Sequence, residues 1–379
     1  MDSADGIVGN IGEWSELYAF CYLLNEGVLK TADHNLNPLS SAYLPVIRII
    51  RKETYEFSYY PKNDSKSVEI YIGDHLIRTV PKSEFESNIS LIYSKLITKG
   101  EHRTIEIPEV QRFLGDIHCT KLKADSKHKK DIVVQIHDVK TGLNPVQGFS
   151  IKSLIGSNPT LLNAGRTTNF KFRLNGCTDS IMQQVNRITE GDKIMLRMGK
   201  LLSSGCKFEY CGMHSETFEK NLRMIDFMMP QILSRMLFLH YSNGTVKLSD
   251  VVKSLEDEDP LDVRNPGFYI YKLKTMLCAM ALGMIPSKPW YGQEDADGGY
   301  IIVKDDGNVI CFFLYNRNEF EQYLMDYTRF DRASTSRHEY MEVLKEDGEF
   351  FIDLNLQIRF IKPGYIPRNK SVETNMDDY

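Results

Sequence analysis

Hydrophobic and polar positions follow two different periods along the first part of the chain. Residues 9–27 carry apolar side chains at every third or fourth position, and this spacing predicts a helix. Residues 43–61 alternate β-branched and aromatic residues with polar ones, and residues 66–81 do so around a central Gly-Asp pair. These two patterns predict strands and a hairpin. The helical spacing then returns at residues 82–100.

Two further strands are predicted at residues 131–138 and 146–156, joined by a turn that contains glycine and proline. Beyond Gly176 the apolar residues recur mainly at helical spacing, and strands return near the C-terminus. We therefore expect an α/β fold with a helix-rich middle and a small final sheet, in the consecutive parts 1–176, 177–290 and 291–379. Residues 1–9 and the polar tail after Pro363 show no periodicity, so we expect them to be irregular.

Composition limits the classes of protein that remain. The chain has 379 residues, 42% of them hydrophobic, which is enough for two or three cores. The net charge of −5 excludes a protein that binds nucleic acid through a wholly basic surface, so a polyanion site must be a local patch. The seven cysteines are an odd number, and we find neither a secretory signal nor a membrane-spanning apolar run. We therefore expect a cytoplasmic protein with no membrane partner.

The predicted strand QGFSIKS, residues 147–153, places Ser150 and Lys152 on the face opposite Phe149 and Ile151. A lysine at such a position has two explanations. It can lie at a sheet edge in water, or it can face a negatively charged group. Asp131 opens the preceding strand, and a short turn between two strands can bring it close to Lys152.

Two more acids, Glu13 and Glu16, lie on the first predicted helix, which could cross the sheet near Asp131. A carboxylate pair beside a lysine suits metal-assisted cleavage of a phosphodiester. Mg²⁺ prefers oxygen ligands and can activate water, and a lysine can stabilise charge that develops on phosphate. In this hypothesis the metal ligands are two acids and the carbonyl oxygen of Ile151.

The longer sequence around this strand narrows the interpretation. Residues 131–170 read DIVVQIHDVKTGLNPVQGFSIKSLIGSNPTLLNAGRTTNF, and STSRHEY and LNLQIRFIK follow near the C-terminus. With residues 9–27, these segments closely resemble the HpaII-type restriction endonucleases. The resemblance extends from Gly9 to about Lys362.

This resemblance implies a PD-(D/E)xK nuclease core, a mixed sheet flanked by helices, in which Asp131 and Lys152 match the first acid and the lysine. Ser150 occupies the position of the second acid, which departs from the basic pattern of that superfamily. Another carboxylate must then complete the metal shell, and our choice is Glu16, with Glu13 as the alternative. Either acid could instead serve only the helix N-terminus, where negative charge is favoured.

The resemblance also implies where DNA is read. The first polar segment after the catalytic strand offers residues that bond bases or phosphates, namely Asn163, Arg166, Thr167, Thr168 and Asn169. A second polar segment near the C-terminus offers Ser334, Ser336, Arg337 and His338. The basic run at 121–130 is a candidate phosphate-binding loop. Solvated or helix-capping loops are the alternative explanation for all three segments.

The activity implied is that of a Type II restriction endonuclease, which hydrolyses both strands of double-stranded DNA with Mg²⁺. The implied target is the palindrome CCGG, and the implied products carry 5′-phosphates. A palindromic target suggests a homodimer, and an unprotected genome would require a cognate DNA methyltransferase. One alternative is a related nuclease with another specificity or a repair role. The other is a DNA-binding protein that has lost catalysis, in which Ser150 replaced the catalytic acid.

One further motif invites a metal site. Cys206, Cys211 and His214 lie close together in the sequence, as zinc ligands do. The interval between the two cysteines is wide for such a site, and no fourth ligand follows at a suitable distance. Buried cysteines are therefore the simpler explanation.

Overall fold

The computed structural model describes residues 6–98, 104–123 and 129–365. The chain forms two compact units that are not consecutive in sequence. Unit 1 comprises Met1–Pro159, Ala281–Gly283 and Glu294–Tyr323, and unit 2 comprises Thr160–Met280, Met284–Gln293 and Leu324–Tyr379. These boundaries do not coincide with those of the three consecutive parts expected from the sequence, because a C-terminal segment returns to complete the N-terminal unit.

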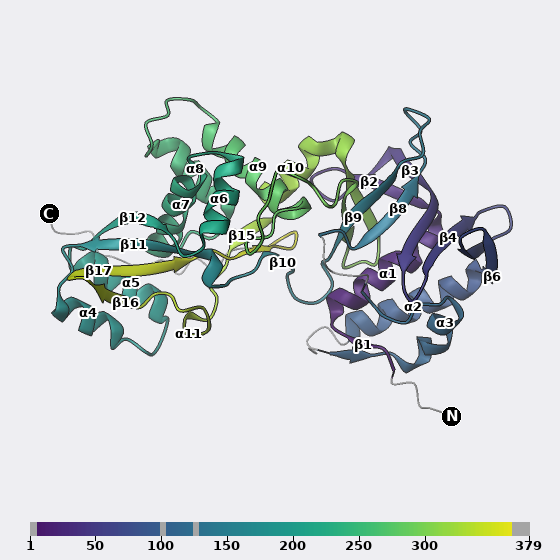
Figure 1. Cartoon of the computed structure of the whole chain (residues 1–379), viewed down its shortest axis with the longest axis horizontal. Helices are drawn as coiled ribbons and strands as arrows, with labels where there is room; N and C mark the ends of the chain where they lie inside the picture. The colour runs from purple at the N-terminus through teal and green to yellow at the C-terminus, as the bar shows by residue number, and fades with distance from the viewer. Residues whose placement is uncertain (1–5, 99–103, 124–128, 366–379) are drawn as a thin grey trace. The chain divides into compact units, whose positions relative to one another are not determined.

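Unit 1 is built on a mixed sheet of nine strands (Figure 1). Four consecutive strands in the interior of the sheet include both strands of the candidate site: β14 (Val309–Phe313), β13 (Gly299–Val303), β9 (Val146–Ser153) and β8 (Ile132–Ile136). The remaining strands are β2 (Val28–Ala32), β3 (Pro38–Lys52), β4 (Glu56–Lys62), β5 (Ser67–Ile72) and β6 (His75–Pro81). This unit also contains a small pairing of β1 (Val8–Gly9) with β7 (Ile105–Glu106).

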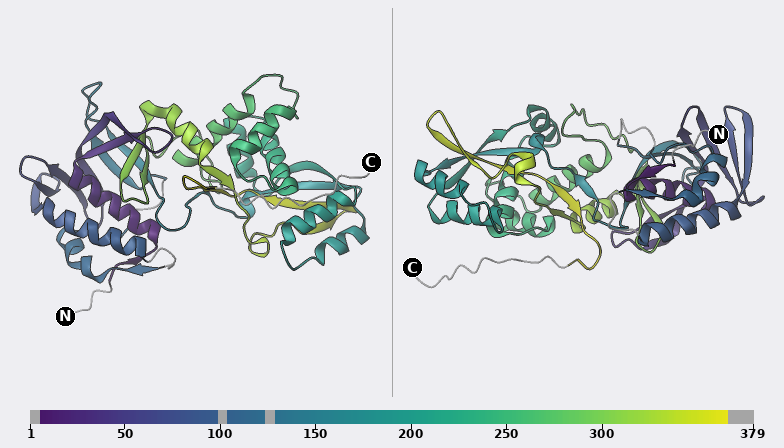
Figure 2. Two further views of the ribbon diagram at one scale, coloured as in Figure 1. Left: turned by 180° about the vertical axis from the view of Figure 1, so that it is seen from behind. Right: turned by 90° about the horizontal axis from the view of Figure 1, so that it is seen from below.

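Helix α1 (Ile11–Glu26) packs against both this sheet and α2 (Lys82–Thr98) (Figures 1 and 2). Its start is set by a capping box, in which Asn10 and Glu13 each bond the other's backbone amide. Its end is set by Gly27, whose φ of 70° lies in the left-handed region. Because α1 is covered on two sides, most of its apolar residues are buried in one core with those of the sheet. The short helix α3 (Gln111–Asp116) belongs to the same unit.

Strand β9 lies in the interior of the sheet. It pairs antiparallel with β8, with Phe149 opposite Ile132, and parallel with β13, with Ser150 opposite Tyr300. Phe149 enters the core shared with α1, as the alternation of the strand predicts. The sheet-edge explanation of Lys152 is therefore wrong, because both neighbours of β9 are present.

Unit 2 contains a four-stranded and a three-stranded sheet with helices around them (Figure 2). The larger sheet has the order β12 (Lys207–Met213), β11 (Asn169–Asn175), β17 (Glu349–Asn355) and β16 (Val343–Glu346). The smaller has the order β10 (Thr160–Leu162), β18 (Ile358–Phe360) and β15 (Thr328–Phe330). The helices are α4 (Asp179–Asn186), α5 (Lys193–Ser203), α6 (Glu216–Ile225), α7 (Met229–Asn243), α8 (Leu248–Glu258) and α11 (Thr335–His338). Helices α9 (Phe268–Leu282) and α10 (Arg317–Asp326) each run across a boundary between the units.

The mixed α/β class and most predicted elements are confirmed, including the first helix, the hairpin β5–β6 and the antiparallel pair β8–β9. Two predictions were wrong. Residues 207–213 form strand β12 within a stretch expected to be helical, and Val8–Gly9 form a short strand in a segment expected to be irregular. The end of the helix predicted at residues 82–100 and the tail beyond Tyr365 lie outside the described residues. Within the described ranges, no helix is long and apolar enough to cross a membrane.

Candidate active site

Asp131 is held at the start of β8 by the neighbouring strand. Its backbone amide donates to the carbonyl oxygen of Phe149 at 2.8 Å. Its carboxylate oxygen Oδ2 accepts the hydroxyl of Ser150 at 3.1 Å and the backbone amide of Ile151 at 2.7 Å. The register of the two strands, with Ile132 opposite Phe149, places Asp131 opposite Ser150 and makes these bonds possible. The structure thus brings the first predicted acid into hydrogen-bond contact with the strand that carries Ser150 and Lys152.

Glu16 contributes a second carboxyl from α1. The residue before it, Ser15, links α1 to β9, because its hydroxyl donates to the hydroxyl of Ser153 at 2.9 Å. The Glu16 side chain is half-buried, and its Oε2 is shielded from solvent and has no hydrogen-bond partner among the described residues. Burial, followed by the nearby charge of Asp131, raises the pKa of Glu16 to about 8, while Lys123 and Lys152 oppose the rise.

The same electrostatic effects show that Glu16, Asp131 and Lys152 share one environment. Lys152 follows Ser150 by two residues in β9 and is half-buried. A buried carboxyl that lacks a hydrogen-bond partner is costly unless it stays protonated or meets a cation. This part of unit 1 is therefore suited to receive positive charge.

Glu13, the alternative acid, has a different local role. Its Oε2 accepts the backbone amide of Asn10 at 2.9 Å, and Asn10 Oδ1 accepts the amide of Glu13 at 3.0 Å. This reciprocal pair is the capping box of α1. The carboxylate of Glu13 is thus already used by the helix N-terminus, which is the structural role that the sequence left open for either acid.

A loop before β13 supports both candidate strands and was not anticipated from the sequence. Asp297 Oδ1 accepts the backbone amide of Gly148 at 2.7 Å, and Asp295 Oδ2 accepts that of Lys129 at 3.2 Å. Each bond is made two residues before a member of the site, Ser150 in one case and Asp131 in the other. The only signal in the sequence was the acidic run EDADGG, whose distance along the chain conceals its proximity.

Lys129 adds a second lysine beside Lys152. Burial, followed by the charge of Lys152, lowers the pKa of Lys129 to about 8, while Asp131 and Asp295 oppose the fall. Lys129 and Lys123 both belong to the predicted basic run at 121–130, of which residues 124–128 lie outside the described ranges. The described part of that run therefore contributes positive charge to the surroundings of Asp131 and Glu16.

In unit 2 the two predicted DNA-reading segments meet, although they are far apart in sequence. Asn169 Nδ2 donates to the backbone carbonyls of His338 at 2.9 Å and Glu339 at 3.2 Å. Asn355 Nδ2 donates in turn to Asn169 Oδ1 at 2.6 Å. Arg166 Nε lies 3.2 Å from Glu339 Oε2, with both side chains more than half exposed. A buried amide network therefore joins the loop around residues 166–168 to α11.

The members of these segments differ in what they can touch. Thr168 and Asn169 are buried, and their polar groups bond within the protein, so they can position the loop but not contact a ligand directly. Asn163 and Arg166 are exposed and Thr167 is half-buried. In the second segment Ser334 caps α11 by accepting the amide of Arg337, and its exposed side chains are Ser334, Ser336 and Arg337, with His338 half-buried.

The possible zinc site is not assembled. Cys206 is buried and Cys211 is exposed. His214 Nε2 lies instead 2.6 Å from Asp353 Oδ2 on β17. No group of three or more histidine, cysteine or carboxylate side chains suited to a metal is found in the described ranges. The pair Asp131 and Glu16 could hold a cation only with further oxygen ligands, such as a backbone carbonyl.

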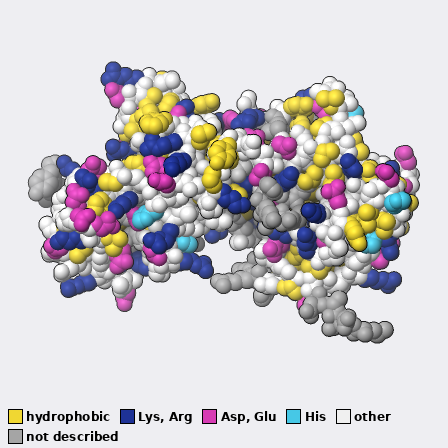
Figure 3. Space-filling model, viewed as in Figure 1, with side chains coloured by type: hydrophobic (Ala, Val, Ile, Leu, Met, Phe, Trp, Pro, Cys, Tyr) yellow, Lys and Arg dark blue, Asp and Glu magenta, His cyan; other side chains and the backbone are white. Residues whose placement is uncertain are grey.

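The visible surface carries both signs of charge. On the face shown in Figure 3, lysine and arginine side chains alternate with carboxylates over both units. This mixture agrees with the net charge of −5. Positive charge that attracts a polyanion must therefore be local, as it is at Lys123, Lys129 and Lys152.

Comparison with known proteins assigns the chain to one family. The model of the HpaII restriction endonuclease family matches residues 10–360. The chain is 39% identical over 357 residues to the Type II restriction enzyme HpaII of Haemophilus parainfluenzae, an alignment that covers 93% of this chain and 98% of that enzyme. No solved structure matches the chain. The chain therefore belongs to the HpaII restriction endonuclease family and is a Type II restriction endonuclease.

Proposed function

We propose that this enzyme hydrolyses both strands of duplex DNA at the palindrome CCGG, that it requires Mg²⁺, and that it leaves 5′-phosphates. The proposal includes a PD-(D/E)xK core in unit 1, with Asp131 and Lys152 as catalytic residues. The observation that carries it is the bonding of Asp131 to Ser150 and Ile151 on the lysine-bearing strand, with Glu16 beside them. The CCGG target follows from the similarity to HpaII.

The residues present fit a divalent cation. Glu16 offers a shielded oxygen with no partner among the described residues, and burial together with the charge of Asp131 raises its pKa. A cation would relieve both conditions, because it pairs with the buried carboxylate and offsets the repulsion. The proposed ligands are Asp131, Glu16 and the carbonyl oxygen of Ile151. Bound Mg²⁺ would polarise the scissile phosphate and lower the pKa of a water molecule.

The chain's own residues would then divide the work. Ser150 and the amide of Ile151 hold one oxygen of Asp131, which fixes the orientation of its carboxylate. Lys152 would face the phosphate and stabilise the charge that develops there. With a cation bound, Glu16 would ionise and supply the negative charge that Ser150 cannot. Glu13, retained as the alternative ligand, is less suited because its carboxylate caps α1.

We place DNA recognition in the two joined segments of unit 2. Arg166 is the proposed reader of guanine, since an arginine can bond two acceptors on that base in the major groove. Asn163, Thr167, Ser334, Ser336, Arg337 and His338 are the other proposed contacts. Thr168 and Asn169 would act by positioning the loop, because their side chains are buried.

The palindromic target favours a homodimer, in which two copies each cut one strand. A DNA methyltransferase that protects the same sequence is the expected companion in the cell. A cytoplasmic location follows from these partners and from the nature of the substrate.

The deciding experiment is digestion of unmethylated phage DNA by the purified protein, with Mg²⁺ and with EDTA, followed by sequencing of the fragment ends. Discrete Mg²⁺-dependent fragments that end within CCGG would support reaction, cofactor and specificity together. Discrete fragments that end at another sequence would retain the chemistry and remove the proposed specificity. Cleavage in EDTA would remove the metal requirement.

A further inference from the structure

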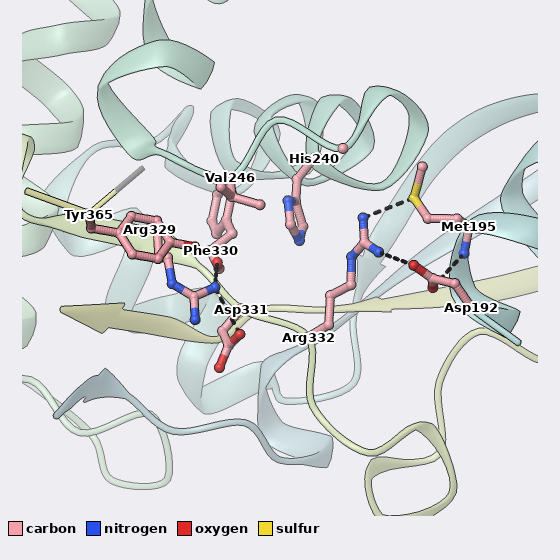
Figure 4. Close-up of a pocket in the computed structure, with 10 residues that line it drawn as sticks. Asp192, Met195, His240, Val246, Arg329, Phe330, Asp331, Arg332 and Tyr365 are labelled. Carbon is pink, nitrogen blue, oxygen red and sulfur yellow. Dashed lines mark hydrogen bonds and ion pairs between the residues drawn. The ribbon is translucent and has the colours of Figure 1, made fainter. Parts of the chain in front are cut away.

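A cavity of about 330 Å³ lies within unit 2, and the chain just before Ser334 forms part of its wall (Figure 4). It is open on one side and is bordered by the C-terminal end of α7, the N-terminal end of α5, and β15 with the chain that follows it. Its wall combines apolar and aromatic side chains with two arginines and two aspartates. Neither the proposed chemistry nor the proposed recognition uses it.

His240, near the end of α7, presents a hydrogen-bond acceptor to this cavity. The residue is 1% exposed, and its Nδ1 lies 2.7 Å from the carbonyl oxygen of Thr245. A carbonyl can only accept, so Nδ1 carries the proton and Nε2 of the neutral ring carries a lone pair. Burial keeps the ring neutral, since it lowers the pKa of His240 to about 4. Nε2 has no partner among the described residues, and the ring points into the space between Arg329 and Arg332 (Figure 4).

The two arginines also line this cavity. Arg332 donates through Nη1 to Asp192 at 3.3 Å and through Nη2 to the sulfur of Met195 at 2.9 Å. Arg329 donates through Nη1 to Asp331 at 2.9 Å. The Nε of each arginine is shielded from solvent and has no hydrogen-bond partner within the described part of the chain. Because each guanidinium already pairs with a carboxylate, the wall offers donors with little net positive charge.

This arrangement selects among guests. A phosphodiester has acceptors but no donor, so it would leave the lone pair of His240 facing negative oxygen. An apolar guest would leave all three nitrogens without partners, which is unfavourable for buried polar groups. A flat heterocycle with a donor beside acceptors would bond both the histidine and the arginines. Its faces could contact the ring of Phe330 and the side chain of Val246, which also line the cavity.

We propose that this cavity binds a nucleobase. All four bases carry a ring or exocyclic N–H next to acceptor atoms, which matches the pattern of one acceptor at His240 and donors at Arg329 and Arg332. Two sources of this chemistry exist. One is a free nucleoside or nucleotide, and the other is a base of bound DNA that has turned out of the helix. Only the second source rests on the proposed function.

Two pairs of variants test the cavity. His240→Asn keeps an amide N–H where Nδ1 bonds Thr245 and removes the acceptor Nε2. Val246→Phe fills the space without altering a polar group, and Val246→Ile is its matched control. Thermal unfolding of each full-length variant would verify folding. Because the two blocking variants act by different means, failure of one to fold leaves the other informative.

The first arm measures binding of cytidine, guanosine, adenosine, thymidine and inorganic phosphate by equilibrium dialysis. The second arm places 2-aminopurine or pyrrolocytosine at each position in and around CCGG in a duplex and records fluorescence on binding with Ca²⁺. Wild-type protein and Val246→Ile should bind a nucleoside, or raise the fluorescence at one position several-fold. His240→Asn and Val246→Phe should weaken nucleoside binding at least tenfold and should abolish the rise in fluorescence.

A signal in the first arm alone assigns the cavity to free nucleosides, and one in the second arm alone assigns it to a base turned out of DNA. The proposal is overturned if neither signal occurs in the wild type, or if both blocking variants match it. Binding of phosphate that His240→Asn abolishes would also overturn it in favour of an anion site. If the protein binds no duplex, the proposed function fails, while the nucleoside arm still decides the cavity.

Discussion

The hydroxyl of Ser150 donates to Asp131 Oδ2 at 3.1 Å, and the same oxygen accepts the backbone amide of Ile151 at 2.7 Å. A serine at this position therefore orients the neighbouring acid and adds no charge of its own. This relationship explains how the strand can depart from the acid-x-lysine pattern. In the proposed active site the second negative charge comes from Glu16 of α1, whose pKa is affected by the charges of Asp131 and Lys152.

Replacement of Ser150 by alanine tests that orienting role. Ser150→Ala removes one of two hydrogen bonds to Asp131 Oδ2, a loss of about 0.5–1.5 kcal/mol. We expect DNA cleavage to slow by roughly tenfold, since each 1.36 kcal/mol corresponds to a factor of ten, while site preference stays unchanged. Single-turnover cleavage rates would measure this. Complete loss of cleavage in a folded Ser150→Ala protein would mean that the hydroxyl has a direct chemical role.

Lys152 and Asp131 should be needed for cleavage and not for sequence-specific binding. Lys152→Ala removes the charge proposed to face the phosphate, and we expect a loss of at least about 10²-fold in the cleavage rate. Asp131→Asn should abolish cleavage because it weakens the proposed metal site. Lys253→Ala is the control, since Lys253 is an exposed lysine on α8 outside the proposed active site and the two DNA-reading segments. Unaltered cleavage by Lys152→Ala would remove that lysine from the active site.

Glu13 and Glu16 should respond to mutation in opposite ways. Glu13→Ala breaks the capping box of α1 and should lower the free energy of unfolding by about 1 kcal/mol while cleavage persists. Glu16→Gln removes a proposed metal ligand, so it should abolish cleavage without loss of stability. Denaturant unfolding and plasmid cleavage of both variants measure the two effects. If Glu13→Ala abolished cleavage and Glu16→Gln did not, the assignment of the two acids would be reversed.

The stability of the metal-free protein should depend on Glu16 in a defined pH window. The pKa of Glu16 is about 8 in the folded state against an ordinary value of 4.5, so between these values the folded state binds more protons than the unfolded state. Stability is therefore lost as pH rises through this window, by at most about 1.4 kcal/mol per unit. Urea unfolding at several pH values should show Glu16→Gln becoming more stable than wild type above pH 4.5, with the difference levelling off above pH 8. A difference that stays constant with pH would contradict the shift.

Variants of Arg166 and Asn169 should distinguish a residue that contacts a DNA base from one that only positions the loop. Arg166→Ala removes an exposed side chain whose ion pair with Glu339 contributes little to stability, so the fold should be unaffected. If Arg166 reads guanine, specific affinity should fall by about 1–3 kcal/mol, with relaxed preference at one position. Asn169→Ala breaks buried bonds to His338 and Glu339, so it should lower thermal stability as well as affinity. If Arg166→Ala bound the cognate site and each altered site with the same affinity as the wild-type protein does, Arg166 would be excluded as a reader.

Local pattern was sufficient to predict much of the secondary structure. The spacing of apolar residues predicts α1, and the Gly-Asp pair predicts the turn between β5 and β6. Periodicity works in these cases because it reflects which side of an element faces solvent. It also identified Asp131, Ser150 and Lys152 as one candidate group, because β8 and β9 are close in sequence and joined by a short turn. Strand β12 was missed because its sequence lies among helical segments and its pairing partner β11 is distant.

Tertiary structure alone decided the relationships that depend on distant parts of the chain. The sequence does not show that β13 lies beside β9, that Asp297 bonds Gly148, or that Asn169 joins two loops. It could not distinguish Glu13 from Glu16, since both occupy the first turns of one helix. The distinction comes from burial and hydrogen bonding, which are set by the packing of α1 on the sheet. The same physical reason applies to His240, whose orientation as an acceptor follows from the carbonyl of Thr245 and the cavity around it.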